Sequence, residues 1–304
     1  MKKKFTILLL VVLIIAISGF IFSYRLLFAD NVSDNDTKKQ HVFFIHTGST
    51  YNNVIASLKE QHIIKNMETF KIVCKKLQYD ERVKPGRYII DNNTGNLFLV
   101  RKLRSGSQDP VRITFNNIQN KEQLAERITV QIEASKEELL SAFNKQHFLD
   151  SLDLTEENFP TIFLANTYEF YWNTSAQQFI ERMLKEYNKF WTEKRKSKAQ
   201  AIGLSPTDVT ILASIIQKES THYDEYPVIA GVYLNRIKIG MPLQADPTVL
   251  YALKKLGVSR RVLNGDLKIQ SPYNTYINKG LPPGPICLPE LQSIDETLNA
   301  EENN

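Results

Sequence analysis

The feature that most constrains this chain is an uncharged apolar run close to its N-terminus. The run covers residues 5–22, FTILLLVVLIIAISGFIF, and follows the three lysines at positions 2–4. In a helix this run rises about 27 Å, close to the hydrocarbon thickness of a bilayer. Because basic residues stay on the cytoplasmic side, they place everything after Arg25 outside the membrane. We therefore predict a cytoplasmic tip and transmembrane anchor over residues 1–25, in the cytoplasmic membrane with the N-terminus inside.

A cleaved signal peptide is the competing interpretation, since it begins with the same basic and apolar regions. However, the run is long for a signal peptide, and no clear Ala-x-Ala site follows it, Ala29 being isolated. We expect a retained anchor and then a linker over residues 26–41. Residues 30–40 of that linker are polar and show no hydrophobic period.

The composition indicates a folded protein and argues against nucleic-acid binding. Of the 304 residues, 42% are hydrophobic and 23% charged, as in an ordinary globular protein. The net charge of +5 is spread along the chain, and part of it flanks the apolar run. A basic outer domain would suit an acidic polymer, although a solvated basic surface explains the same charge.

The cysteines and histidines predict neither a metal site nor another cofactor. Cys74 and Cys287 lie far apart and without a neighbouring ligand cluster, so no zinc or redox motif can be built from them. The five histidines contain no His-x-x-x-His pair. If the chain is exported, a disulfide between the two cysteines stays open.

Strand-like and helix-like segments alternate between residues 42 and 115. Strand patterns cover 42–45, 86–90 and 111–115, and apolar residues recur at helical spacing over 54–58, 70–74 and 96–103. This compact alternation is typical of one small α/β module.

Helical patterns dominate from residue 116 to 304. Apolar faces recur around 136–145, 177–190, 205–220 and 226–239. The predicted fold class is therefore α+β. It comprises a single N-terminal transmembrane helix, a small α/β module and a mostly helical domain with short strands.

The most informative helical segment covers residues 204–220, LSPTDVTILASIIQKES. Ser205 is a good N-cap, and Asp208 completes a capping box three residues later. This register points positions 209, 212, 215 and 216 toward the core and puts Glu219 on the same stripe, in the last turn. Burial and the negative helix end would both raise the pKa of Glu219, as a general acid requires. From periodicity alone, a glutamate that reaches solvent explains the position at least as well.

Polar residues after this helix have both structural and ligand-binding explanations. Asn235 lies on the inward stripe of a helix that Gly240 ends, and Asp246 is the expected N-cap before Pro247. Each could brace the fold or contact a ligand. Loops 271–276 and 280–285, rich in Tyr, Pro and Gly, offer apolar faces and hydrogen-bonding edges that suit sugar rings.

Three longer stretches carry a resemblance to a known family. They are ASIIQKES (213–220), AGVYLNRIKIGMPLQADPTVLYAL (230–253) and SPYNTYINKGLPPGPI (271–286). They resemble the YceG-like family, the endolytic murein transglycosylases of the MltG type, and the similarity extends from about residue 42 to residue 298. The resemblance implies a LysM-like module over 42–115 and a catalytic domain over 116–304 that stops short of the family's usual end. It also implies cleavage of the MurNAc–GlcNAc β-1,4 bond of nascent peptidoglycan, leaving a 1,6-anhydro-MurNAc end that terminates elongation.

The resemblance assigns the catalytic role to Glu219. One carboxyl group suffices, because it can protonate the leaving oxygen and then deprotonate the sugar's own 6-hydroxyl. Where the family has an aspartate, this chain has Asn166. The matching stretches supply the residues expected to bind substrate: Tyr168, Glu169, Asn235, Arg236, Gln244, Asp246, Thr248, Ser271, Tyr273, Asn274 and Tyr276.

Two other functions stay open at this stage. A hydrolytic muramidase would share the substrate and need a second carboxylate, for which Glu169, Asp224, Glu225 and Asp246 are candidates. A non-catalytic scaffold would bind glycan strands through the LysM-like module. The expected partners are peptidoglycan glycan strands, the cytoplasmic membrane and, from the resemblance, cell-wall synthases.

Overall fold

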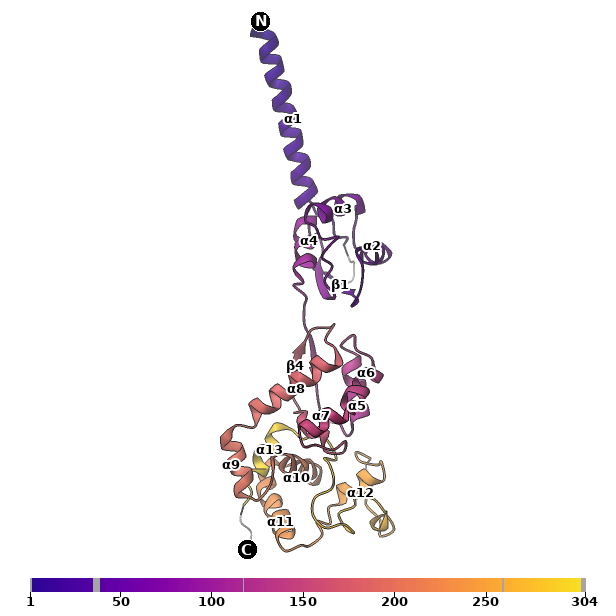
Figure 1. Ribbon diagram of the computed structural model, residues 1–304, viewed down its shortest axis with the longest axis vertical. Helices are drawn as coiled ribbons and strands as arrows, with labels where there is room; N and C mark the ends of the chain where they lie inside the picture. Colours follow the sequence, from indigo (N-terminus) through magenta and orange to yellow (C-terminus); the bar gives the residue numbers. More distant parts are fainter. Residues whose placement is uncertain (1, 35–38, 117, 259, 302–304) are drawn as a thin grey trace. The chain divides into compact units, whose positions relative to one another are not determined.

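A computed structural model describes residues 2–34, 39–116, 118–258 and 260–301. Contacts divide the chain into two compact units, and Figure 1 shows the elements of each. Unit 1 contains residues 1–111 and 171–173, and unit 2 contains residues 112–170 and 174–304. The division falls close to the expected boundary after residue 115. Residues 171–173 join unit 1 because the Trp172 ring lies 4.8 Å from that of Phe44 and 5.0 Å from that of His46.

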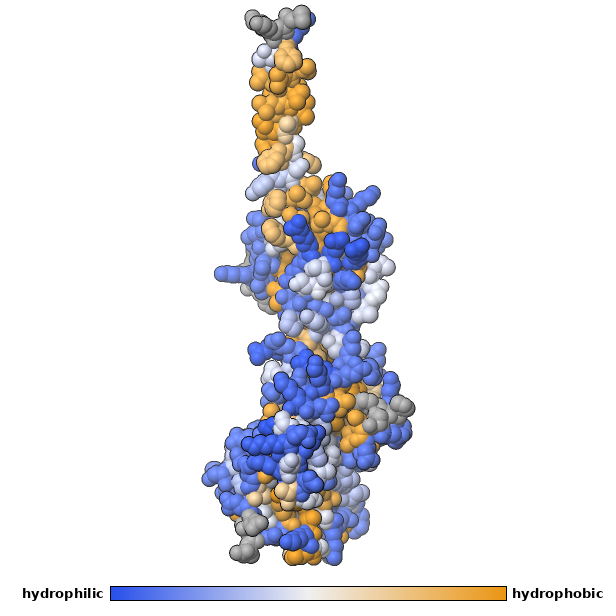
Figure 2. Space-filling model, turned by 60° about the vertical axis from the view of Figure 1, so that its left-hand side comes forward, coloured by the Kyte–Doolittle hydropathy of each residue, from blue (hydrophilic) through white to orange (hydrophobic). Residues whose placement is uncertain are grey.

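Helix α1 (Lys2–Phe28) begins the chain. Its segment Lys4–Phe28 contains an 18-residue window with a mean hydropathy of 3.0 and is long and apolar enough to cross a membrane. Its apolar side chains are exposed over residues 5–22, and Figure 2 shows them on one face of the helix. An exposed helix that is apolar on every side has the length and composition of a membrane span and not those of a core helix. The predicted N-terminal span is therefore consistent with the structure.

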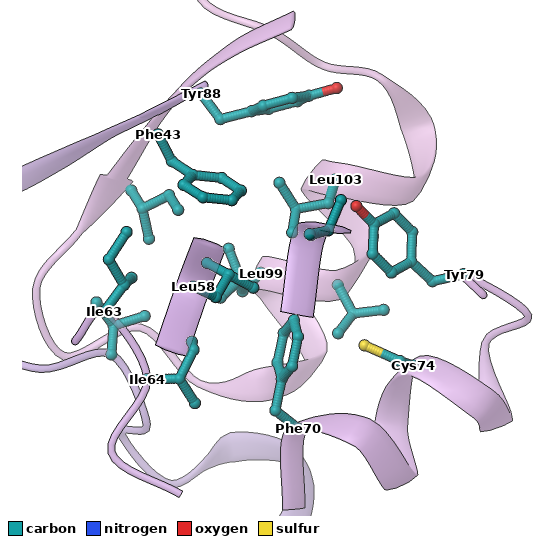
Figure 3. Close-up of a cluster of buried hydrophobic side chains, with 14 of the residues drawn as sticks. Phe43, Leu58, Ile63, Ile64, Phe70, Cys74, Tyr79, Tyr88, Leu99 and Leu103 are labelled. Carbon is teal, nitrogen blue, oxygen red and sulfur yellow. The ribbon is translucent and has the colours of Figure 1, made fainter. Parts of the chain in front are cut away.

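Unit 1 places three helices around a two-stranded sheet. Its elements are β1 (Gln40–Ile45), α2 (Tyr51–Glu60), α3 (Met67–Lys76), β2 (Gly86–Asp91) and α4 (Asn96–Ser105). β1 and β2 pair antiparallel, from Gln40 opposite Asp91 to Ile45 opposite Gly86. Figure 3 shows the core that this arrangement encloses, with Phe43 and Tyr88 from the strands facing Leu58, Phe70 and Leu103 from the helices.

The segment expected to be a linker is part of unit 1 instead. Val32 is fully buried in its core, and Asn31 is also buried. The Asn31 amide donates to Asn96 Oδ1 over 2.7 Å and accepts from the Asn66 backbone N–H over 2.7 Å. Composition indicated a linker because the segment is polar, but this asparagine crosslinks two helix N-termini. Residues 35–38 of the expected linker lie outside the described residues.

The end of α1 is attached to the start of α4. The Asn96 side chain donates to the Leu26 carbonyl over 2.9 Å. At Gly95, an added Cβ atom would lie 2.9 Å from the Phe28 carbonyl oxygen, so only glycine allows this approach without a backbone shift. The final turn of the membrane helix is therefore built into the fold of unit 1.

Unit 2 is mostly helical, as predicted. Its helices are α5 (Lys121–Thr129), α6 (Lys136–Phe143), α7 (Gln146–Ser151), α8 (Ala176–Phe190), α9 (Glu193–Ala201), α10 (Pro206–Glu219), α11 (Tyr226–Lys238), α12 (Asp246–Ala252) and α13 (Leu291–Thr297), with 3-10 turns η1 (Phe159–Ile162), η2 (Tyr223–Glu225) and η3 (Asp266–Lys268). Strands β3 (Val111–Thr114) and β4 (Thr167–Phe170) form a second small sheet. The helix-rich α+β class is thus confirmed, while the LysM likeness of unit 1 stays a prediction.

Helix α10 is the central element of unit 2, in contact with α9, α11, α12 and α13. The predicted capping box is present. Ser205 Oγ accepts from the Asp208 N–H, and Asp208 Oδ2 accepts from the Ser205 N–H, each over 3.1 Å. Val209, Leu212, Ile215 and Ile216 are all fully buried, as predicted, but the residues between them are buried too, so α10 is enclosed on every side over residues 209–216. The two cysteines, one in each unit, are buried free thiols.

Candidate functional site

Two polar residues of α10 fix its last turns to the segment that leads into α13. Ser214 is fully buried, and its hydroxyl donates to the Ile211 carbonyl over 2.7 Å while accepting from the Ile286 N–H over 3.0 Å. One turn later, Gln217 Oε1 accepts from the Glu290 N–H and the Ser293 hydroxyl, both over 2.7 Å. The end of α10 is therefore held from one side along two turns.

Glu219 is the last residue of α10. Its side chain is exposed to water, so the buried stripe ends before it, in contrast to the expectation that Glu219 itself is buried. The carboxyl group nevertheless lies among enough protein atoms that desolvation raises its pKa. The predicted direction of the shift is confirmed. The charge of Asp246 is the second cause of the upward shift, and the predicted effect of the helix end stays a prediction.

Helix α11 brings two side chains to Glu219. Tyr233, which is buried, shares a hydrogen bond with the Glu219 carboxyl group that lowers the pKa of Glu219 and raises that of the tyrosine. One turn along, the positive charge of Arg236 also lowers the pKa of Glu219. The Arg236 guanidinium donates to the Leu243 carbonyl, which fixes its position. The carboxyl group is therefore hydrogen-bonded to a phenol and lies in the electric field of a guanidinium.

The start of α12 and the loop 271–278 supply the other half of this cluster. The Tyr276 hydroxyl donates to Asp246 Oδ1 over 2.6 Å, and burial with this bond raises the pKa of Tyr276 to about 12. The charge of Asp246 raises the pKa of Glu219, and the charge of Glu219 contributes to the raised pKa of Tyr276. We call Glu219, Tyr233, Arg236, Asp246 and Tyr276 the carboxylate cluster.

Asp246 is not the N-cap of α12 as expected. The N-cap position is occupied by Ala245, and no side-chain hydrogen bond caps this helix. Its first turn is instead stabilised by Thr275 Oγ1, which accepts from the Ala245 N–H over 3.0 Å. The Asp246 carboxyl group is thus available to bind the Tyr276 hydroxyl.

Two of the residues predicted to bind substrate lie behind the carboxylate cluster. Thr248 and Asn274 are fully buried. Thr248 Oγ1 lies 2.8 Å from Thr275 Oγ1 and donates to the Ala245 carbonyl over 2.7 Å. The Asn274 amide donates to the carbonyls of Leu267 and Ile269, each over 2.9 Å. These two residues position the loop and α12 rather than facing solvent.

The remaining loop residues are partly exposed beside the cluster. Gln244 is exposed and has a left-handed φ of 53°, and its N–H donates to the Thr275 carbonyl over 2.9 Å. Ser271 Oγ accepts from the Tyr273 N–H over 3.2 Å. The Tyr273 ring packs 4.7 Å from that of Tyr251. The loop is therefore ordered by its own polar groups.

Three residues predicted to bind substrate do not lie where the sequence indicated. Asn235 is exposed, as are Val228 and Val232, so the stripe assigned inward on this helix faces outward. Tyr168 is buried, with its hydroxyl donating to the Leu164 carbonyl over 3.0 Å. Glu169 is exposed on the same strand, β4, which Figure 1 shows beside α8 and well separated from α11 and α12. The structure does not bring Tyr168 or Glu169 to the carboxylate cluster.

Sequence reasoning did not single out Tyr233, Thr275, Ser214 or Gln217. Tyr233 lies one turn before Arg236 on α11, so the same helical spacing could have identified it. Ser214 and Gln217 are polar residues inside a buried helix, a pattern that indicates side-chain hydrogen bonds to another segment. Among the described residues, no three His, Cys, Asp or Glu side chains gather as a metal site would need.

The carboxylate cluster has the properties of an acid–base site. A carboxyl group whose pKa is raised keeps its proton to higher pH than a free one, and neighbouring phenols can orient it. Fold and cluster together define a protein with a long apolar N-terminal helix whose helical unit presents one such carboxyl group at the end of a braced helix.

Comparison with known proteins gives the family. The sequence model of the YceG-like family matches residues 43–304, and this chain belongs to that family. The endolytic murein transglycosylase of Bacillus subtilis is 30% identical over 291 residues, which cover 89% of this chain and 79% of that protein. The endolytic murein transglycosylase of Streptococcus pneumoniae D39 is 26% identical over 99% of this chain, which spans 60% of that relative's length. The crystal structure of a yceG-like protein from Listeria monocytogenes aligns with a TM-score of 0.56 at 28% identity, covering 87% of this chain and 91% of that one.

Proposed function

We propose that this chain is a lytic transglycosylase that cleaves the MurNAc–GlcNAc β-1,4 bond within peptidoglycan strands. Family membership and relatives named endolytic murein transglycosylases support this class of reaction. The single observation that carries it is the position of Glu219, at the end of a braced helix with a raised pKa. A general acid for a glycosidic oxygen needs such a carboxyl group.

In the proposed reaction Glu219 acts twice. Its protonated carboxyl group gives a proton to the glycosidic oxygen, and the bond from the MurNAc C1 to that oxygen breaks. The 6-hydroxyl of the same MurNAc then attacks C1 and passes its proton to the Glu219 carboxylate. The product ends in 1,6-anhydro-MurNAc, and Glu219 is protonated again. Because the nucleophile belongs to the substrate, the step needs neither a bound water nor a second carboxylate.

The other members of the carboxylate cluster tune and orient Glu219. The charge of Asp246 keeps the carboxyl group protonated to higher pH, while Tyr233 and Arg236 favour the carboxylate that forms after proton transfer. A site that stabilises the protonated form through Asp246 and the carboxylate through Tyr233 and Arg236 suits a group that must donate and then accept a proton. We assign substrate contacts to exposed or partly exposed groups around it: Asn235, Arg236, Gln244, Asp246, Ser271, Tyr273 and Tyr276.

We further propose that α1 remains as a single-pass anchor in the cytoplasmic membrane, with both units outside. A signal peptidase acting at Ala29 would remove the Leu26 carbonyl that Asn96 binds and the Phe28 backbone that Gly95 contacts. Retention therefore agrees with how unit 1 is built. The anchor would hold the enzyme close to newly made strands, and unit 1, with its β-α-α-β order, would be the LysM-like glycan-binding module.

A hydrolytic muramidase is the second candidate, because Asp246 is a carboxylate close enough to influence Glu219. In that case Asp246 would activate a water molecule. However, Asp246 accepts a hydrogen bond from Tyr276 and is also the source of the upward pKa shift of Glu219. Binding Tyr276 and raising the pKa of Glu219 explain an aspartate at position 246 without any role in activating water.

Digestion of purified peptidoglycan by the full chain tests the proposal. We expect the wild type to release fragments with anhydro ends and the Glu219→Gln variant to lose at least about a hundredfold of the rate. Glu193→Gln, a matched change on an exposed glutamate of α9, should keep its activity. Reducing ends from the wild type would support the muramidase, and the absence of cleavage would support a non-catalytic scaffold.

A further inference from the structure

Unit 1 contains a pocket of about 860 Å3 whose wall is almost entirely cationic. Five basic side chains line it, from the loop before β2 and from the second half of α4: Arg82, Lys84, Arg101, Lys102 and Arg104. The other two lining residues are Ser105 and Ser107, and the lining contains no acidic side chain. The pocket is therefore a site for an anion.

One of the five cations is already neutralised. Lys102 Nζ lies 2.8 Å from Asp109 Oδ2 and donates to the Ile89 carbonyl over 2.7 Å. The other four have no carboxylate within 4.0 Å among the described residues. In addition, the buried Nε of Arg104 has no hydrogen-bond partner there. An anion bound among these four like charges would offset their mutual repulsion and give the unused buried donor a partner.

The end of α4 shapes the pocket. Gly106 adopts a left-handed φ of 73° and ends the helix, and the Ser107 N–H donates back to the Lys102 carbonyl over 3.3 Å. A Cβ atom at Gly106 would lie 3.4 Å from the Lys84 side chain. The end of α4 and the loop before β2 are thus packed together, so the backbone that carries the basic side chains is held in place.

The location of the pocket argues against lipid head groups as its ligand. α4 starts at the junction with α1, where Asn96 binds Leu26, and the pocket lies around its other end. A helix of this length is about 15 Å long, so the pocket is well away from the end of the membrane span. The position therefore favours a ligand away from the lipid surface.

We infer that this pocket binds the carboxylate groups of peptidoglycan stem peptides, so that unit 1 holds the strand through its peptides. This inference rests on the proposed function, which makes peptidoglycan the polymer at hand. Arginine presents a planar fork that binds a carboxylate through two hydrogen bonds, and three of the four unpaired cations are arginines. A pocket of this volume has room for more than one carboxylate group.

Co-sedimentation with insoluble peptidoglycan tests the inference, with the full chain carrying Glu219→Gln so that binding is read without cleavage. Arg82→Gln/Arg101→Gln/Arg104→Gln should bind roughly tenfold more weakly, with the difference disappearing at high salt. The matched control is Lys59→Gln/Lys75→Gln/Lys76→Gln, which removes the same charge from exposed positions of α2 and α3. It should bind within about twofold of the parent. Lys84→Gln/Arg101→Gln spares the half-buried Arg104 and should show an intermediate loss if the triple variant is unstable.

Three preparations of peptidoglycan identify the ligand. Peptidoglycan stripped of phosphodiester polymers should bind as well as the unstripped material, and carbodiimide amidation of its carboxylates should reduce binding to the level of the arginine variant. Equal losses in the two triple variants, or unchanged binding after amidation, would overturn the inference. Loss of binding on stripping alone would assign the pocket to a phosphodiester polymer and would also overturn it. None of these outcomes depends on whether the wild type cleaves glycan strands.

Discussion

The negative charge of Asp246 acts directly on Glu219, raising the pKa of a carboxyl group that burial has already made harder to ionise. The two residues lie on different helices, at the end of α10 and the start of α12. The proton-donating form of Glu219 therefore depends on how α12 is held against α10. The buried Thr248 and Thr275 pair in turn fixes α12 to the loop that carries Tyr276, the hydrogen-bond partner of Asp246.

Replacing Asp246 with asparagine tests this relationship. Asparagine keeps an oxygen that can accept from Tyr276 but removes the charge that raises the pKa of Glu219. The pKa of Glu219 should fall, so the acid form should be lost at lower pH. We expect the alkaline limb of the kcat/KM profile to move toward acid, and an unchanged profile would show that Asp246 does not tune Glu219.

Tyr233→Phe should move the same limb in the opposite direction. The tyrosine hydrogen bond stabilises the Glu219 carboxylate, so its removal should raise the pKa of Glu219 and extend the active range toward alkaline pH. The rate at the plateau should fall because the carboxyl group loses an orienting contact. Two variants that shift the profile in the same direction would contradict this account of the cluster.

Ser214→Ala should destabilise unit 2. The substitution leaves the buried Ile286 N–H without its acceptor, which costs about 1–3 kcal/mol. Chemical denaturation of the variant measures this loss. Ser107→Ala, an exposed serine in unit 1, is the matched control and should lie within about 0.5 kcal/mol of the wild type. An equal effect of both variants would show that Ser214 does not brace α10.

Gly95→Ala should disturb the junction between α1 and unit 1. The added methyl group would lie 2.9 Å from the Phe28 carbonyl oxygen and 3.0 Å from its carbon, contacts that require a backbone shift. We expect a loss of stability on the order of 1–3 kcal/mol and faster proteolysis between residues 28 and 40. Gly265, with φ of −67° and nothing within 4 Å of an added Cβ, is the control position, where alanine should be tolerated. Unchanged proteolysis of Gly95→Ala would mean that α1 is only loosely attached.

Elements marked by strong local signals could be predicted from the sequence. The capping box at Ser205 and Asp208 defined the register of α10, and the buried stripe followed from it. The strand β4 and the helix α13 could not be predicted in this way. β4 has four residues and depends on pairing with β3 across more than fifty residues of chain. α13 begins without a side-chain cap and is positioned partly through Gln217.

The candidate site could be predicted only in part, because tertiary contacts decide which polar groups meet. Glu219 was identified from its helix and its family motif, but the side chains that set its pKa come from α11 and α12. Asn31 was assigned to a linker because it is polar, although it is buried and hydrogen-bonded to the first turn of α4 and the N-cap of α3. Thr248 and Asn274 lie in a family-like stretch and yet face the protein interior, since a motif does not distinguish a ligand contact from a residue that positions one.

The central claim, that Glu219 transfers the glycosidic proton and the sugar's own hydroxyl closes the ring, can be measured by cleavage in water enriched in oxygen-18. Lytic cleavage should place no heavy oxygen in the new MurNAc end, which should be one water lighter than a hydrolysed end. The Glu219→Gln variant should release almost no product under the same conditions. Incorporation of one heavy oxygen at that end by the wild type, or full activity of Glu219→Gln, would contradict the account.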